Sequence, residues 1–300
     1  MDVSENLYQN YNDIDDTIIE SVKQEMLPRF KSTIDYDPKD VDLLSNDNWF
    51  ITRHAMVCNR RVQFTTFIKD LVDKIDTCLK VRRQLGLHQI KPTDFPREFY
   101  ELRVFDLGFD DVTKKSVIHI RLGNYVDIPE FADQIVRFVV YCASECFKTL
   151  APYQQFVCIT DASKFEVEDV NTRTMYSLMT SMDAIGQYMF ETTYMFNVVE
   201  PLNRVIQFFS NNFNTYRRNT IKMVKTDDYK EKVPLSQWPK SLGGQLEMRP
   251  YLPENLNLSN CISLEDFANM HSIPDKNFAR ASRTLRNVIR STSIRSSNNG

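Results

Sequence analysis

Apolar residues recur at helical spacing throughout the first third of the chain. The spacing over residues 64–85 predicts a long helix that Gly86 ends as a C-cap. Residues 14–30 show the same periodicity, and Asp37-Pro38 is typical of the start of a further helix because proline is tolerated in the first turn. We therefore expect this region to be entirely helical.

The pattern changes after about residue 105, where short apolar runs alternate with helical periodicities. The predicted strands are residues 117–122, 156–161, 194–200 and 220–225. The predicted helices between and after them are residues 128–150, 170–190 and 201–213. Strands that alternate with helices indicate crossover connections, so we expect an α/β fold with a mainly parallel sheet.

This division predicts four regions along the chain. Residues 1–13 are polar and expected to be flexible, residues 14–90 form the helical region, and residues 91–250 form the sheet-containing lobe. Residues 251–300 are a C-terminal extension, and the sequence RSTSIRSSNNG at its end predicts a basic, disordered tail.

Composition narrows the class of protein. The chain has 300 residues, of which 42% are hydrophobic, and 20 are phenylalanines, which suits either a large core or an apolar cavity. The net charge of -3 argues against binding of nucleic acid. No apolar run approaches the roughly 20 residues of a membrane span, and the polar start is unlike a secretory signal. We expect a cytosolic protein with reduced cysteines and at most peripheral membrane contact.

Motifs for catalysis are absent. The seven glycines form neither GxGxxG nor a P-loop, and the sequence lacks GxSxG, HExxH and CxxC. His119 is interpreted as a core histidine, Cys142 and Cys146 as core thiols rather than metal ligands, and Asp161 as a capping residue rather than a functional carboxylate. We predict no enzymatic activity, no metal and no cofactor, with a bound lipid expected instead.

Residues 194–244 carry a resemblance to a known family. A strand ends at Glu200-Pro201, an apolar helix and another strand follow, and Trp238-Pro239 leads to Gly243-Gly244. This order, together with FVCITDASKF at residues 156–165, resembles the CRAL-TRIO family of lipid-binding proteins. Residues 36–54 and 78–87 are similar to the CRAL-TRIO half of motile-sperm-domain-containing proteins. The immunoglobulin-like domain and membrane anchor of that branch are missing, so anchoring to the endoplasmic reticulum is not carried over.

The resemblance implies a CRAL-TRIO-N-like helical bundle beside a lobe whose sheet forms the floor of a lipid pocket under a gate helix. Strand alternation and the resemblance together place six residues in the pocket: Phe156, Cys158, Thr160, Met195, Asn197 and Val199. Five residues form the apolar stripe of the gate helix: Leu202, Val205, Ile206, Phe209 and Phe213. Without the resemblance, the same stripe is explained by a surface helix that covers the core.

Two basic segments have more than one interpretation. Arg217, Arg218, Lys222 and Lys225 either contact anionic lipid or a headgroup at the pocket mouth or form a solvated face. The Glu-Arg pair and the Lys of phosphoinositide-binding relatives correspond here to Phe190-Glu191 and Thr220, which weakens the case for an inositol headgroup. Residues 278–295 either lie on an anionic membrane, with Ser282 and Ser293 as candidate phosphorylation sites that weaken binding, or are disordered.

The sequence therefore predicts a non-enzymatic carrier or sensor. It binds a phospholipid or another hydrophobic ligand in an internal pocket and acts at cytosolic membrane surfaces. The expected partners are the lipid and a transient membrane surface, with no nucleic acid. The alternative is a protein-interaction adaptor that uses the CRAL-TRIO fold with a reduced or empty pocket.

Overall fold

A computed structural model describes residues 14–31, 34–58, 62–125, 128–163, 165, 171–210, 215–225 and 228–298. The chain divides into two compact units, Met1–Gln89 and Ile90–Gly300, which are considered separately. The expected flexible segment, residues 1–13, lies outside the described residues. Among the described residues, no helix is both long and apolar enough to cross a membrane.

The first unit is helical, as the periodicity predicts. Its α-helices are α2 (Asp16–Met26), α3 (Pro38–Asn46), α4 (Asn48–Ala55) and α5 (Phe64–Leu85). Asp15, Asp37 and Asp47 each cap a helix, because each side chain accepts a hydrogen bond from a backbone N–H of the first turn. Gly86 ends α5 at φ 64°, a conformation that glycine adopts without steric cost.

A buried ion pair connects two of these helices. The carboxylate of Asp40 on α3 is fully buried and accepts hydrogen bonds from Arg82 Nε on α5 and from His88 Nε2, each at 2.7 Å. A buried carboxylate needs such partners because its desolvation is otherwise uncompensated. The pair thus fixes the position of α3 against the end of α5.

The second unit contains a six-stranded sheet with helices. Its strands are β1 (Phe105–Asp110), β2 (Lys115–Arg121), β3 (Phe156–Asp161), β4 (Phe190–Phe196), β5 (Ile221–Met223) and β6 (Arg249–Pro250). Its α-helices are α6 (Arg97–Glu101), α7 (Ala132–Phe147), α8 (Thr172–Ile185), α9 (Glu200–Ser210), α10 (Thr215–Thr220), α11 (Tyr229–Lys232), α12 (Leu264–Met270) and α13 (Asp275–Asn298). The strand order is β5-β4-β3-β2-β1-β6.

Pairing in this sheet is mainly parallel. Strands β2 to β5 pair in parallel, whereas β1 pairs antiparallel with both β2 and β6. The predicted α/β fold, with N-terminal helices followed by a mainly parallel sheet, is confirmed. Strand β2 corresponds to the predicted strand at residues 117–122, whereas β1 and β6 were not among the predicted strands. The two residues of β6 are too few to show alternation.

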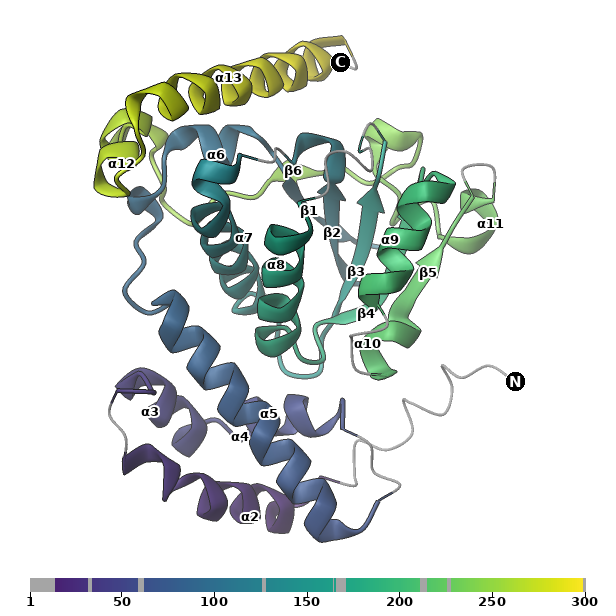
Figure 1. Cartoon of the computed structure of the whole chain (residues 1–300). Coiled ribbons are helices and arrows are strands. Elements are labelled where there is room, and N and C mark those ends of the chain that lie inside the picture. Colours follow the sequence, from purple (N-terminus) through teal and green to yellow (C-terminus); the bar gives the residue numbers. More distant parts are fainter. Residues whose placement is uncertain are drawn as a thin grey trace. The chain divides into compact units, whose positions relative to one another are not determined.

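The sheet has two differently covered faces. On the front face, α7, α8 and α9 lie over the strands (Figure 1), and Ala143 and Cys146 of α7 pack against Phe156. On the back face, Trp238 packs against Val157, Ile159 and other buried residues. A Cβ on Gly244 would stand 2.0 Å from the carbonyl oxygen of Trp238, so only glycine allows this close return of the chain.

The C-terminal extension differs from the expectation of disorder. Residues 275–298 form α13 in place of a disordered tail. Ala281 and Leu285, four residues apart, are buried and give the helix one apolar side despite its polar composition. Ser282 is buried as well, which argues against its proposed phosphorylation, and Ser293 lies where no side chain is described.

Two buried histidines make stability depend on pH. Burial and nearby arginines lower the pKa of His54 and of His119 to about 3, from 6.5. Below pH 6.5 the unfolded chain takes up these protons but the folded chain does not, so the stability present at neutral pH is lost as pH falls. Between pH 7 and pH 5 each histidine is expected to lower the free energy of unfolding by about 2 kcal/mol.

His119→Leu should therefore reduce the loss of unfolding free energy between pH 7 and pH 5 by about 2 kcal/mol. Urea denaturation of the wild type and the variant at both pH values measures this difference, and carboxylate contributions cancel in the comparison. An unchanged loss in the variant would show that His119 titrates normally in the folded protein.

Candidate functional site

Strand β4 is unusually open for an internal strand. It pairs with β3 on one side and β5 on the other, yet every residue from Phe190 to Met195 is only half-buried. Internal strands of parallel sheets are normally covered on both faces. Residues of both faces share this partial exposure, so on the front face too the protein's own side chains do not fully cover β4.

Register places the predicted pocket residues of β3 on this front face. Cys158 pairs with Thr193, and Thr160 pairs with Met195, so these four side chains point to one side of the sheet. Cys158 and Thr160 are buried, whereas Thr193 and Met195 are half-buried. Met223 of β5 pairs with Met195 and is 39% exposed. Coverage of the front face thus decreases from β3 toward β5.

Helix α8 contributes an apolar wall with the same partial exposure. Met175, Leu178 and Met182 recur at helical spacing and are all half-buried, while Thr174 and Ser181 are its buried polar residues. Met182 packs against the cluster around Phe156, and Met175 packs against residues beyond the carboxyl end of β3. Methionine side chains adapt to neighbours of varied shape.

The predicted gate helix is α9, and its described apolar residues point inward. Leu202 is buried against Ala162 and Phe165, and Ile206 is half-buried at the same cluster. Val205 is also half-buried. Nothing is described for the side chain of Phe209 or for Phe213, so the predicted stripe is seen over only part of its length. The helix therefore rests on the lobe through its first half.

Asn197 and Val199 do not continue the strand, which contradicts the alternation predicted for residues 194–200. The strand ends at Phe196, and Asn197 takes a left-handed conformation with φ 57°. Its Nδ2 donates hydrogen bonds to Asp161 Oδ1 at 2.9 Å and to Ser163 Oγ at 2.7 Å. The turn directs Asn197 toward the end of β3 and leaves Val199 exposed just before α9.

The predicted basic residues do not gather in one place. Lys222 pairs with Tyr194, so it points to the back face, and its Nζ lies 5.9 Å from the centre of that ring. Arg218 and Lys225 are exposed, and the side chain of Arg217 lies outside the described residues. This arrangement separates Lys222 from the open part of the front face.

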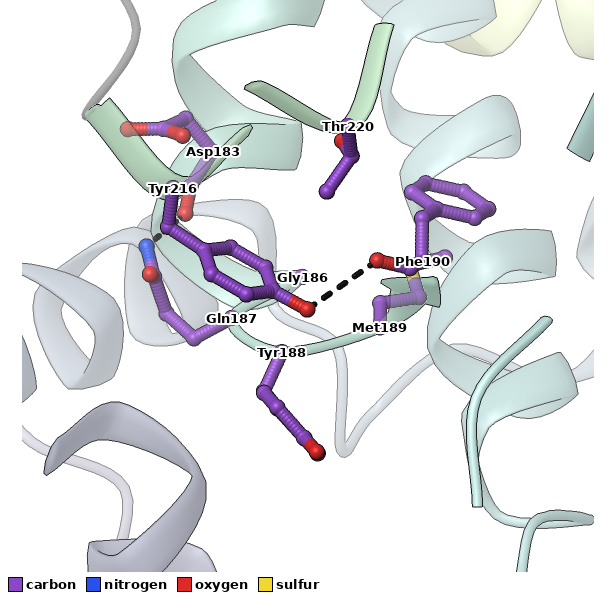
Figure 2. A pocket seen from close by; sticks show the side chains of 8 residues that line it. All are labelled: Asp183, Gly186, Gln187, Tyr188, Met189, Phe190, Tyr216 and Thr220. Atoms are coloured by element: carbon purple, nitrogen blue, oxygen red, sulfur yellow. Dashed lines mark hydrogen bonds between the residues drawn. The ribbon is translucent and has the colours of Figure 1, made fainter. Parts of the chain in front are cut away.

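A small cavity lies beneath α10 (Figure 2), at the start of β4. Its volume is about 10 Å³, which is about the space of one water molecule. Tyr216 of α10 donates from its hydroxyl to the Phe190 carbonyl at 3.2 Å and accepts from Gln155 Nε2 at 2.5 Å. These contacts anchor α10 to the sheet.

The polar groups of the back face form no catalytic arrangement in the described residues. Asp106 is fully buried and pairs with Arg121, and burial raises its pKa despite that pairing. His119 is also fully buried, and neither ring nitrogen has a hydrogen-bond partner in the described part of the chain. No group of three or more His, Cys, Asp or Glu among the described residues is placed to hold a metal ion.

Comparison with known proteins agrees with this geometry. Residues 104–244 match the family model of the CRAL/TRIO domain. The fold is similar to the crystal structure of Sfh5, with 14% sequence identity and a TM-score of 0.56 over 82% of this chain and 90% of that chain. No curated protein matches the chain.

The segment that matches the CRAL/TRIO model begins one residue before β1 and ends at Gly244, and it includes every residue of the open front face. Sequence reasoning identified Cys158, Thr160 and Met195 on this face. It missed Thr193, because the third strand was assigned to start at residue 194. It also missed Met223 and the anchoring residue Tyr216, because their roles depend on strand pairing and on α10.

The conformation of Asn197 gives a test of how the lobe directs the chain into α9. Asn197→Gly loses the two side-chain hydrogen bonds but tolerates the left-handed backbone, whereas Asn197→Ala loses the bonds and strains the backbone. Urea denaturation should show the alanine variant less stable than the glycine variant by about 1 kcal/mol. Equal stabilities would mean that the turn relaxes to another conformation.

Proposed function

We propose that the CRAL/TRIO lobe binds one lipid, with an apolar chain lying against the front face of β4 and β5. The observation that carries this proposal is the half-exposed apolar surface of an internal strand, formed by Met195 and extended by Met223. An apolar surface of this kind favours contact with a hydrocarbon chain over contact with water. The resemblance of the sequence and the match of residues 104–244 support the same class of ligand.

In this proposal α9 acts as a lid. Full exposure to water of an inward side chain such as Leu202 or Ile206 costs roughly 1.5–3 kcal/mol of hydrophobic free energy. At a membrane the same side chains enter an apolar phase, so opening costs less there than in solution. Phe208, which is 68% exposed on the closed helix, is already available to contact a bilayer. Exchange of lipid is thereby coupled to membrane contact.

The proposal describes a cytosolic, non-enzymatic carrier or sensor that visits membrane surfaces and needs no cofactor. Thr160 and Thr193 supply polar groups near the apolar floor, which suits orientation of a lipid head. Because Lys222 points to the back face, we assign headgroup contact to Arg218 and Lys225 rather than to the predicted set of four. Membership of the motile-sperm-domain branch stays a prediction from the N-terminal helices.

The rival function is that of an adaptor whose pocket is reduced or empty. The cavity beneath α10 is too small for a lipid, and Cys158 and Thr160 are already buried by protein. The open surface over β4 favours the lipid-binding function over this rival. Native mass spectrometry of the full chain after gentle purification separates them, because the carrier should retain one lipid per chain and the adaptor none.

Met195→Trp should reduce the bound lipid severalfold, because the larger side chain occupies the surface where the acyl chain would lie. Native mass spectrometry and lipid extraction measure the occupancy. Met56→Trp is the matched control, since Met56 is also half-buried but belongs to the helical unit. If Met195→Trp retains full occupancy while folding normally, the ligand does not lie on β4.

Ile206→Asp tests the lid. The new carboxylate cannot stay against the apolar cluster, so α9 should open more often and a bound fluorescent lipid should leave the protein faster. Gln207→Asp adds the same charge at the neighbouring exposed position and should leave the release rate unchanged. Equal release rates for the two variants would refute a lid role for α9.

A further inference from the structure

Helix α13 carries a continuous basic stripe. At 100° per residue, the five basic residues from Lys276 to Arg290 fall within an arc of roughly 120°. All of these side chains are exposed: Lys276, Arg280, Arg283, Arg286 and Arg290. The only acidic residue of the helix is Asp275, at its first position. Since the whole chain has a net charge of -3, the stripe is a local concentration of positive charge.

The opposite side of α13 attaches the helix to the second unit. Ala281 and Leu285 are buried there, and the helix contacts α6, α12 and the short helix Pro129–Phe131. Arg280, at the margin of the stripe, pairs with Glu130 of that short helix. The basic stripe is therefore held outward by a packed apolar side and an ion pair, and its charges do not rotate toward the protein.

The centre of the stripe has no internal counter-charge. Among the described residues, no acidic side chain pairs with Arg283, Arg286 or Arg290. Positions three and four apart lie next to each other on a helix, so Arg283 and Arg286, like Arg286 and Arg290, repel each other and destabilise the isolated helix. An external anionic surface removes this repulsion, which makes the stripe complementary to such a surface.

An exposed apolar side chain just before the helix favours a lipid surface over other polyanions. Met270, at the end of α12 and five residues before α13 begins, is 68% exposed. Basic residues beside exposed apolar ones are typical of segments that bind at a membrane interface, where the charges meet headgroups and the apolar groups enter the bilayer. Nucleic acid offers no apolar phase for such a side chain.

We propose that the basic stripe of α13 docks the protein on membranes that contain anionic lipid. Docking in this way does not require a ligand on β4. Figure 1 shows α13 at the end of the lobe toward which the arrow of β3 points. At the same end, the cluster of Leu202 and Ile206 receives the first half of α9. Docking through α13 thus brings the start of α9 close to the bilayer.

Vesicle co-sedimentation of the full chain tests this proposal. The wild type should bind vesicles of phosphatidylcholine mixed with phosphatidylserine, bind phosphatidylcholine alone weakly, and lose binding as salt is raised. The triple variant R283E/R286E/R290E should lose on the order of 100-fold in affinity, since each arginine near an anionic surface contributes about fivefold. R283Q/R286Q/R290Q, which removes charge without reversing it, should show a smaller loss.

K39E/K69E/K91E is the matched control, because it changes the net charge equally at three exposed lysines that do not belong to α13. Its binding should stay within a few fold of the wild type. The proposal is overturned if the control loses as much affinity as R283E/R286E/R290E, if both α13 variants bind like the wild type, or if phosphatidylcholine alone binds equally well. It is also overturned if an oligonucleotide binds the stripe more tightly than the anionic vesicles do.

Native mass spectrometry of the same variants separates this proposal from the lipid-carrier function. The α13 variants should keep their bound lipid, because none of the substituted side chains lies at the front face. A wild type that holds no lipid yet binds anionic vesicles through α13 would refute the carrier function alone.

Discussion

Parallel pairing of β2 to β5 is the constraint on which the other features depend. Parallel neighbours cannot be joined by tight turns. Each connection therefore leaves the carboxyl end of one strand, passes over a face of the sheet as a helix and enters the amino end of the next strand. This brings the carboxyl ends of β3 and β4 together, where Asn197 hydrogen-bonds to Asp161. It also requires α7, α8 and α9 to share one face, and their incomplete coverage leaves β4 partly open.

The unequal coverage of the two faces follows from what packs on each. The back face is closed by Trp238, Leu246 and Val233, which pack directly on buried strand residues. The front face is closed over β3 by α7, whose buried residues include Ala143 and Cys146. Over β4 and β5 the cover is α8 and α9. Apart from the buried Ile185 and Leu202, apolar residues of these helices such as Met175, Met182 and Ile206 are only half-buried. The surface proposed to bind lipid is therefore confined to the front face of β4 and β5.

Local chemistry explains what could be predicted from sequence. Helix α5 was predicted with its observed ends because its apolar spacing is regular and Gly86 terminates it. Strand β3 was predicted over its observed residues because it is a short apolar run before Asp161. Cys158 and Thr160 follow from simple alternation. The helix α13 was missed because most of its residues are polar, and only Ala281 and Leu285 indicate a packed side.

The remaining features of the site depend on long-range geometry. The left-handed turn at Asn197 is stabilised by Asp161 and Ser163, more than thirty residues earlier. Strand alternation therefore gave the wrong side-chain directions after Phe196. The partial exposure of Met195 depends on how far α8 and α9 extend over the sheet. Tyr216 anchors α10 to the sheet through its contacts with Gln155 and the backbone of Phe190. No local pattern encodes these relations.

The close return of the chain at Gly244 has a mechanical consequence. Because the backbone at Gly244 is pressed against the carbonyl of Trp238, and the Trp238 indole donates to the Leu242 carbonyl at 2.9 Å, the rear wall has little freedom to yield. We therefore expect thermal motion of the lobe to be larger in the helices of the front face than in the segment around Trp238 and Gly244. Movement of those helices would not require the back face to rearrange.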